Sequence, residues 1–341
     1  MAKLKVGIIN VTGYAGVELA RLLYRHPKVS LSSVTGRSAA GQKLADVFPH
    51  LAEIKITISA ELHDVDFVFS AMPHKSSIEA ILSFVKRDIK VVDMSADCRL
   101  KDGNEYPKWY DFTHPAPELL AKAVYGLPEI HREEIAKASL VAIPGCYPTG
   151  ALLALAPAIR EGIVHNDIII DSKSGVSGAG RTLSLTTHYT EAVDNVCAYS
   201  VRGHRHLPEI VQELEALASA PVSVTFLPHL VPMSRGILSS CYATLKQDVL
   251  GKKGEVSELY HHYYKDEPFV RVVDKAPETK HVWGSNVCLV YPIVDTRSNK
   301  LIVISCIDNL VKGAAGQAVQ DMNIMLGFSE TEGLEALPVY P

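Results

Sequence analysis

Short apolar runs alternate with stretches of helical periodicity through the first half of the chain. The first run, residues 5–10, leads into a stretch with apolar side chains on one helical face and charged side chains on the other. Further apolar runs lie at residues 29–35, 66–71, 91–95 and 140–143, with helical stretches at 76–85 and around 135. This alternation predicts a parallel, doubly wound sheet. Residues 101–123, rich in proline and aromatic side chains, interrupt it and predict a long irregular connection.

Strands dominate the second half. After an apolar run at 168–172 and a glycine-rich polar loop at 173–181, a helix is predicted over 207–217. Turn-bounded runs follow at residues 222–227, 237–245, 269–273, 286–294 and 301–307. They are typical of a largely antiparallel sheet with one open face, in an α+β domain. Helices or another subunit must cover its apolar side. Residues 308–317 then open a last helix that ends near Leu326.

Composition narrows the class of protein. The 341 residues are 47% hydrophobic and 21% charged, which is ordinary for an enzyme of two domains. A net charge of -4 without a basic run argues against nucleic acid and membrane surfaces as partners, and no apolar run could span a bilayer. The chain enters a strand at once, which predicts no secretory signal. Six scattered cysteines without a CxxC pair predict free thiols in a reducing cytoplasm rather than a zinc or disulfide framework.

The first strand and helix are joined by a glycine turn. Gly13 and Gly16 would let backbone N–H groups approach a pyrophosphate at the helix N-terminus, as in a Rossmann-type domain. Glycine turns of this kind also occur in α/β proteins without a nucleotide. At the end of the second strand, Arg37 and Ser38 stand where an NAD site usually has an acidic residue. They suit a 2′-phosphate and favour NADP(H), although Arg37 could be a solvated loop residue.

Cys146 follows a short apolar run that ends in Pro-Gly, and a helical stretch begins there. Backbone amides and the positive end of the helix dipole at such a position favour the thiolate, which is the nucleophilic form. The alternative is a buried structural cysteine. The Pro-Gly turn favours the nucleophile because it lifts the side chain to the carboxyl end of a strand, where open α/β sheets bind ligands.

A cluster of basic and acidic side chains opens the predicted helix at 207. His204 or His206 could act as acid and base beside the thiol, with Arg202 and Arg205 holding an anionic substrate. The two histidines could instead bind a metal ion, but no further ligands follow at a recognisable spacing, so no metal is predicted. The other alternative is a polar loop at the start of a helix, with ordinary surface histidines. Arg235, between two predicted strands, is either a further anion contact or part of a proline-stiffened turn.

These groups together fit one reaction type. A thiolate attacks an activated acyl carbon, the resulting thioester accepts a hydride from a nicotinamide, and a histidine assists collapse to an aldehyde.

The chain resembles the N-acetyl-γ-glutamyl-phosphate reductase family, whose members are relatives of aspartate-semialdehyde dehydrogenase. The match runs along nearly the whole length. Its motifs lie at residues 13–16, 72–74, 92–99, 124–129, 144–149, 175–180, 203–206, 228–233 and 308–314. The resemblance implies NADPH-dependent reduction of N-acetyl-γ-glutamyl phosphate to the semialdehyde with release of phosphate. It also implies dimers or tetramers assembled through the second-domain sheet.

The resemblance carries over to individual residues and to the division into domains. It implies Cys146 as nucleophile and a histidine of the 203–206 motif as acid/base, with His204 slightly favoured over His206. Expected cofactor contacts are Thr12, Gly13, Tyr14, Ala15, Gly16, Arg37, Ser38, Pro73, Ser177, Gly178, Asn309 and Lys312. Expected substrate contacts are Arg99, Tyr147, Arg205, Glu209 and Arg235. An NADP-binding domain of residues 1–146 would be completed by the helical C-terminus, 312–341, and residues 147–311 would form the catalytic and oligomerisation domain.

One departure from the family pattern is Asn10, which stands in the phosphate turn where the family usually has glycine. Asparagine tolerates left-handed backbone angles better than most residues, so we expect the turn to survive.

Two other functions stay open on the sequence. One is the lysine-pathway counterpart, which reduces a phosphorylated α-aminoadipate attached to a carrier protein. A single methylene separates the two substrates, which a pocket discriminates by only ~1–3 kcal/mol. The other is a non-enzymatic NADP-binding sensor, which the joint presence of Cys146 and the histidine motif disfavours.

Overall fold

The computed structural model describes residues 3–247 and 253–341. The chain divides into two compact units. The first is Met1–Gly145 with Ala314–Ala336, and the second is Cys146–Gly313 with Leu337–Pro341. The division expected from sequence differs at the C-terminus, because the last five residues belong to the second unit. The last helix, α11, spans Gly316–Met325, so most of the segment beyond it is not helical.

The described part of the first unit contains a parallel sheet of seven strands. Their order is β3-β2-β1-β4-β5-β7-β6, and every pair is parallel, which confirms the predicted doubly wound sheet. The strands are β1 (Leu4–Ile9), β2 (Val29–Thr35), β3 (Ile58–Ser59), β4 (Phe67–Ser70), β5 (Lys90–Asp93), β6 (Val124–Tyr125) and β7 (Leu140–Ala142). The chain changes direction across the sheet between β1 and β4, and ligands of such sheets bind at this switch point.

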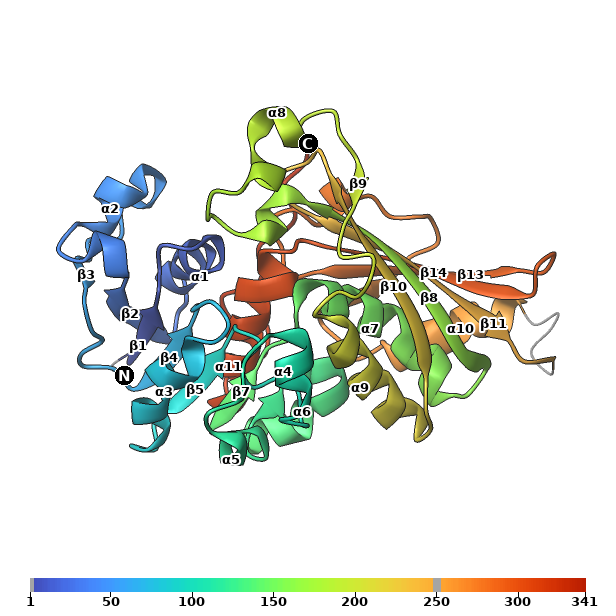
Figure 1. Ribbon diagram of the computed structural model, residues 1–341, viewed down its shortest axis with the longest axis horizontal. Coiled ribbons are helices and arrows are strands. Elements are labelled where there is room, and N and C mark those ends of the chain that lie inside the picture. The colour runs from blue at the N-terminus through green and yellow to red at the C-terminus, as the bar shows by residue number, and fades with distance from the viewer. Residues whose placement is uncertain (1–2, 248–252) are drawn as a thin grey trace. The chain divides into compact units, whose positions relative to one another are not determined.

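Helices cover this sheet. The main ones are α1 (Tyr14–Tyr24), α3 (Ser77–Val85), α6 (Pro128–Lys137) and α11. α11 comes from the far end of the sequence and packs against α1 and α6 (Figure 1). A buried contact of 2.9 Å between His26 Nε2 and Asn323 Oδ1 ties α11 to the end of α1. Shorter helical turns are η1 (Arg37–Ala39), α2 (Leu44–Val47) and η2 (Pro49–Leu51).

The expected irregular connection at 101–123 is partly helical. It contains α4 (Glu105–Trp109) and α5 (Pro117–Leu120). Its aromatic side chains form a small core around Tyr106, which is fully buried. The prediction of irregular structure holds for the rest of the connection and was wrong for these two helices, which are too short to show a periodicity and are stabilised by aromatic packing.

The second unit is built on a mixed sheet. Its described strands are β8 (Val164–Gly175), β9 (Cys197–Ala198), β10 (Ser223–Val231), β11 (Ile237–Leu245), β12 (Val270–Val272), β13 (Cys288–Asp295) and β14 (Lys300–Ile307), in the order β12-β13-β14-β11-β8-β10-β9. Four pairs are antiparallel, which confirms the largely antiparallel prediction, while β10 with β8 and β12 with β13 are parallel. β8 runs three residues into the predicted loop because Lys173 pairs with both His229 and Leu238.

Helices cover one face of this sheet. α7 (Cys146–Arg160) lies against β8, β11 and β14, and it also contacts α9 (Leu207–Ala218) and α10 (Lys253–Tyr263) (Figure 1). The opposite face leaves Ile169 and Ile293 exposed at 47% and 41%. The remaining turns are η3 (Val176–Ala179), η4 (Leu185–Thr187), α8 (Tyr189–Ala192), η6 (Thr279–Val282) and the π-helical η7 (Val311–Ala315). Among the described residues, no helix combines the length and the apolar character that crossing a membrane requires.

Gly16 permits the tight entry into α1. A methyl group at residue 16 would lie 2.5 Å from the Asn10 carbonyl oxygen and 2.8 Å from the Val11 Cα, and backbone atoms do not yield easily. We therefore expect Gly16→Ala to lower the free energy of unfolding by about 1–3 kcal/mol in a urea titration. Gly103→Ala is the matched control, since its methyl group would meet only Leu120 Cδ1 at 3.6 Å. Equal midpoints for the two variants would contradict the prediction.

Candidate active site

The turn after β1 is fixed by Asn10. This residue has a φ of 65°, the left-handed angle that the sequence predicts the turn to require. Its backbone N–H donates to Thr35 Oγ1 at 3.1 Å, and its side-chain Nδ2 donates to the Ala71 carbonyl at 2.8 Å. Thr12 Oγ1 donates to Asn10 Oδ1 at 3.3 Å. Asn10 thus joins the carboxyl ends of β1, β2 and β4, and the turn survives without glycine at this position.

The N-terminus of α1 suits a phosphate group. Gly13 is its N-cap, no side chain caps it, and the first turn has no acidic residue. A methyl group at residue 13 would meet only Asn10 Nδ2, at 3.8 Å, so the space beside the first amides is open. Tyr14 is exposed and Ala15 is half-buried. Open amides at the positive end of a helix are the environment that a dinucleotide pyrophosphate requires, so these residues fit that group.

Arg37 and Ser38 lie exposed on η1, immediately after β2. Among the described residues, no ion pair or hydrogen bond holds the Arg37 guanidinium, so it is available to a 2′-phosphate. Pro73 is exposed in the connection from β4 to α3.

Sequence reasoning missed Asp97, which holds the connection from β4 to α3 in place. Its carboxylate accepts hydrogen bonds from the backbone N–H groups of Lys75, Ser77 and Ile78.

Arg99, expected at the substrate, braces the backbone of the first unit. Its side chain is buried, and its Nε donates to the Ile143 carbonyl at 2.8 Å. Its Nη2 donates to the Met94 carbonyl at 3.0 Å. These bonds connect the segments that follow β5 and β7.

Cys146 is the first residue of α7, as the sequence predicts, and its side chain is half-buried. Space beside it depends on Gly313, because a methyl group there would lie 2.9 Å from the Cys146 Cβ. The next residue, Tyr147, is 3% exposed. Its hydroxyl accepts a hydrogen bond from Tyr199 Oη at 2.8 Å and donates to the His229 carbonyl at 3.4 Å. Tyr199 was not singled out in the sequence, and His229 only as part of the motif at 228–233, because only folding brings these residues to Tyr147.

His204 packs inside this aromatic cluster. Its ring centroid lies 5.6 Å from that of Tyr147, 5.5 Å from that of Tyr199 and 4.7 Å from that of His206. Burial disfavours the charged form of a side chain, so it raises the pKa of a phenol. It raises the pKa of Tyr199 to about 12, and a negative charge on Cys146 contributes in the same direction. Cys146 is joined to this cluster through the next residue, Tyr147, whose ring packs against that of His204.

The protonation state of His204 follows from its surroundings. Burial, and after it the positive charge of Arg205, lowers its pKa to about 4. The His206 backbone N–H donates to His204 Nδ1 at 3.1 Å. Because Nδ1 accepts this bond, the neutral ring carries its proton on Nε2. Arg205 itself is exposed, while Glu209 on α9 is fully buried.

Four of the expected contacts gather at the ends of β8, β10 and β14. Asn309 Nδ2 donates to Ser177 Oγ at 3.0 Å, and Gly178 lies beside it. Asn309 Oδ1 accepts the Gly236 N–H at 2.7 Å, next to Arg235. Lys312 is fully buried, with its Nζ 5.8 Å from the ring centroid of Phe269. Ser177, Gly178, Arg235 and Asn309 are therefore neighbours within the second unit.

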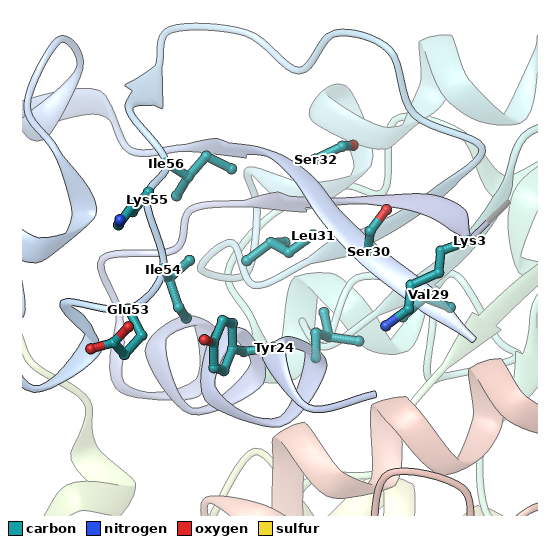
Figure 2. Close-up of a pocket in the computed structure, with 11 residues that line it drawn as sticks. Lys3, Tyr24, Val29, Ser30, Leu31, Ser32, Glu53, Ile54, Lys55 and Ile56 are labelled. Atoms are coloured by element: carbon teal, nitrogen blue, oxygen red, sulfur yellow. The ribbon is translucent and has the colours of Figure 1, made fainter. Parts of the chain in front are cut away.

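Within the part of the chain that the structure describes, no three histidine, cysteine, aspartate or glutamate side chains converge as metal ligands would. A cavity of about 330 Å³ in the first unit lies between Tyr24 at the end of α1, the start of β2 and residues 53–56 (Figure 2). Because Tyr24 ends α1 and Gly13 begins it, this cavity is not the phosphate turn.

Comparisons with known proteins cover the whole chain. The family model of the semialdehyde dehydrogenase NAD binding domain matches residues 5–138, and that of the semialdehyde dehydrogenase dimerisation domain matches residues 146–309. A relative from Dehalococcoides mccartyi is 56% identical over 100% of both chains. One from Geobacter metallireducens is 49% identical over 99% of this chain and 100% of its own. Both are named N-acetyl-gamma-glutamyl-phosphate reductase.

Solved structures show the same fold at low identity. Aspartate semialdehyde dehydrogenase II from Vibrio cholerae aligns over 96% of this chain and 99% of its own, with a TM-score of 0.72 and 17% identity. The enzyme from Candida albicans, solved with NADP, aligns over 95% and 99% with a TM-score of 0.73 and 16% identity.

We expect the His204 ring to stay neutral, with its proton on Nε2, between pH 8 and pH 5. ¹H–¹⁵N spectra of the histidine rings measure this, and His204→Asn assigns the signal. The pKa lies below the ordinary 6.5, so the stability gained from the neutral ring is present above pH 6.5 and is lost as the pH falls toward 4. Arg205→Gln should raise the pKa of His204, because it removes the neighbouring positive charge. A charged His204 ring at pH 6.5 in the wild type would contradict the prediction.

Proposed function

The chain belongs to the semialdehyde dehydrogenase family, in its N-acetyl-gamma-glutamyl-phosphate reductase branch, and we propose that it reduces N-acetyl-γ-glutamyl phosphate to N-acetylglutamate 5-semialdehyde with NADPH, releasing phosphate, in arginine biosynthesis. The observation that carries the proposal is Cys146 at the start of α7, directly before Tyr147, whose ring centroid lies 5.6 Å from that of His204. Relatives at 46–57% identity over the full chain carry this name. None of these names refers to an aminoadipyl compound or a carrier protein, so a free small molecule is the favoured substrate.

The first unit would hold the cofactor. The amides from Gly13 to Gly16 suit its pyrophosphate, and the exposed Arg37 and Ser38 suit a 2′-phosphate. NADPH bound there supplies the hydride for the reduction. Thr12, Tyr14, Ala15 and Pro73 border the same strand ends.

Cys146 would act as the nucleophile. Its thiolate, favoured by the N-terminus of α7, attacks the acyl carbon. The new bond joins sulfur to carbon, and the carbon–oxygen bond to the phosphate breaks with its electron pair leaving on the phosphate. The product on the enzyme is a thioester, which is reduced in the second step.

His204, rather than His206, would assist that second step, and as a hydrogen-bond donor. Its Nε2–H donates to the thioester oxygen as this oxygen becomes negative, since Nδ1 is already occupied by the His206 N–H. When the oxyanion collapses, the carbonyl re-forms and the thiolate leaves, so the ring neither gains nor loses a proton. The proton of the overall reaction is taken from solvent by the released phosphate.

Substrate binding would fall to Arg235, Tyr147 and Arg205. Arg235 is half-buried and carries a charge suited to the substrate's phosphate or carboxylate. Arg205 is exposed beside the cluster. Glu209 and Arg99 are buried, and we expect them to act through the backbone and side chains that they hold.

Assembly and location are also proposals. The exposed Ile169 and Ile293 on the open sheet face, within the region matched by the dimerisation domain family, support a homodimer or a homotetramer. Sedimentation velocity tests this, and Ile293→Glu should shift the protein toward the monomer. Six free cysteines support a reducing cytoplasmic location.

The reverse reaction tests the function directly. We expect NADP⁺ reduction that requires both phosphate and N-acetylglutamate semialdehyde, followed by absorbance at the NADPH maximum. The aminoadipate homologue is the comparison substrate. Turnover with the homologue alone would overturn the arginine-pathway function, and no turnover with either compound in a protein that binds NADPH would favour the sensor alternative.

Cys146→Ala should abolish turnover and leave NADPH affinity near that of the wild type. The reason is that the thiol acts on the acyl carbon and makes no contribution to the nucleotide turn. Steady-state kinetics and NADPH fluorescence titration measure the two effects. Cys197→Ala is a matched control for loss of a half-buried thiol. Loss of NADPH binding in Cys146→Ala would contradict the assignment.

Arg37→Ala should weaken NADPH binding by roughly tenfold or more and leave NADH binding nearly unchanged, since a charge-assisted bond to a 2′-phosphate contributes about 1.5–3 kcal/mol. Fluorescence titration with each nucleotide provides the comparison. Equal losses for both nucleotides would remove the basis for NADP selectivity.

A further inference from the structure

We propose that Asp308 is the positioning residue that holds the Arg235 guanidinium in place to receive the substrate's anionic group. This inference rests on the proposed function, in which Arg235 contacts the substrate. Asp308 itself would not touch the substrate, because its side chain is fully buried.

The carboxylate of Asp308 connects three separate segments of the second unit. Its Oδ2 accepts a hydrogen bond from Arg235 Nη1 at 3.1 Å and another from the Gly284 N–H at 2.7 Å. Its Oδ1 accepts the Leu310 N–H at 2.9 Å. Asp308 is therefore a fixed acceptor at the end of β14, and Arg235 is bound to it from the turn between β10 and β11.

The two partners differ in exposure. The side chain of Asp308 is 0% exposed, whereas that of Arg235 is 27% exposed. The guanidinium thus reaches from a buried carboxylate toward solvent. A charge held in this way is ordered before a ligand arrives, so the ligand does not have to restrict a flexible side chain.

The backbone of Arg235 is fixed as well. Trp283 Nε1 donates to the Arg235 carbonyl at 3.1 Å, and the following amide, that of Gly236, donates to Asn309. On the other side, a methyl group at Gly175 would lie 2.8 Å from the Arg235 nitrogen, so the end of β8 lies against this turn. Both the backbone and the guanidinium of Arg235 are therefore held in place. A surface ion pair does not need its backbone fixed in this way.

The same strand end leads to the thiol. Lys173, two residues before Gly175 on β8, pairs with His229 on β10, and the His229 carbonyl accepts a hydrogen bond at 3.4 Å from the hydroxyl of Tyr147, the residue after Cys146. Gly175 lies against Arg235, and Lys173 pairs with the residue whose carbonyl binds Tyr147, so a short stretch of β8 connects the turn of Arg235 to the start of α7. This connection supports Arg235 as the cation for the anionic end of a substrate bound at Cys146.

Two effects of neutralising Asp308 oppose each other. Removing its negative charge would leave more positive potential at Arg235 and favour an anion. Losing the charged bond would release the guanidinium, which would then have to be ordered by the ligand. Positioning dominates if the guanidinium acts as a directional hydrogen-bond donor rather than as a point charge.

The experiment is a double-mutant cycle in the reverse reaction, with NADP⁺, phosphate and N-acetylglutamate semialdehyde. Arg235→Ala first identifies the anion, because it should raise the KM of either phosphate or the semialdehyde carboxylate. Asp308→Asn should raise the same KM about tenfold, which equals ~1.4 kcal/mol, with kcat and the KM of NADP⁺ within about twofold. In the Arg235→Ala background, Asp308→Asn should raise that KM no further.

Two other variants keep the test independent of folding. Arg235→Lys retains the charge but not the planar fork, and it should raise the same KM even if Asp308→Asn does not fold. Glu330→Gln is the matched control, because Glu330 pairs with Arg132 in the first unit through contacts of 3.0 and 3.2 Å. It should leave the KM of phosphate and of the semialdehyde unchanged.

The outcomes separate the inference from its premise. If Arg235→Ala raises one KM and Asp308→Asn leaves it unchanged or lowers it, the positioning role is overturned and the substrate contact stands. Additive effects in the double variant, or a fall in kcat alone, also overturn it, since they indicate a general structural role. If Arg235→Ala changes neither KM, or the wild type shows no turnover, the proposed contact or the proposed function fails and the inference fails with it.

Discussion

Burial of α7 is the constraint on which the chemistry of the second unit depends. Every residue from Tyr147 to Ile159 is buried, so the helix has no freedom to slide or tilt without opening the core. Cys146 stands at its first position and therefore inherits a fixed location and a fixed orientation of the surrounding amides. The tyrosine that follows it is bonded to Tyr199 and to the His229 carbonyl, which extends this rigidity to the segment carrying the histidines. The Cys146 thiol is thus held at one position because the residues behind it are buried and closely packed.

Buried carboxylates play a parallel role in both units. Asp97 accepts three backbone N–H groups around the start of α3, and Asp308 accepts two backbone N–H groups and a guanidinium. In each case a negative charge satisfies amides that would otherwise be unpaired at the end of a strand or helix. Loops at the carboxyl ends of strands carry the candidate ligand contacts, and these carboxylates give the loops one conformation.

The sequence was most informative where a feature depends on neighbours along the chain. The parallel sheet, the start of a helix at Cys146 and the left-handed angle at Asn10 all follow from local patterns. It was least informative where the partner comes from far away. Tyr199 lies in none of the motifs, and Asp308 lies in the motif at 308–314 without an assigned role, since their partners Tyr147 and Arg235 are 52 and 73 residues distant. Arg99 shows the converse limit, because the family resemblance implied a substrate contact and only the fold reveals the carbonyl groups that it binds.

The side chain of Asn10 makes the phosphate turn susceptible to deamidation. Its side-chain nitrogen donates to the Ala71 carbonyl, so hydrolysis of the amide to a carboxylate would replace a donor with an acceptor and set two oxygens against each other. The new negative charge would also stand beside the amides of the phosphate turn. A glycine at this position would be immune to such damage but could not tie the three strand ends together. The rigidity of the turn therefore depends on an amide group that hydrolysis would remove.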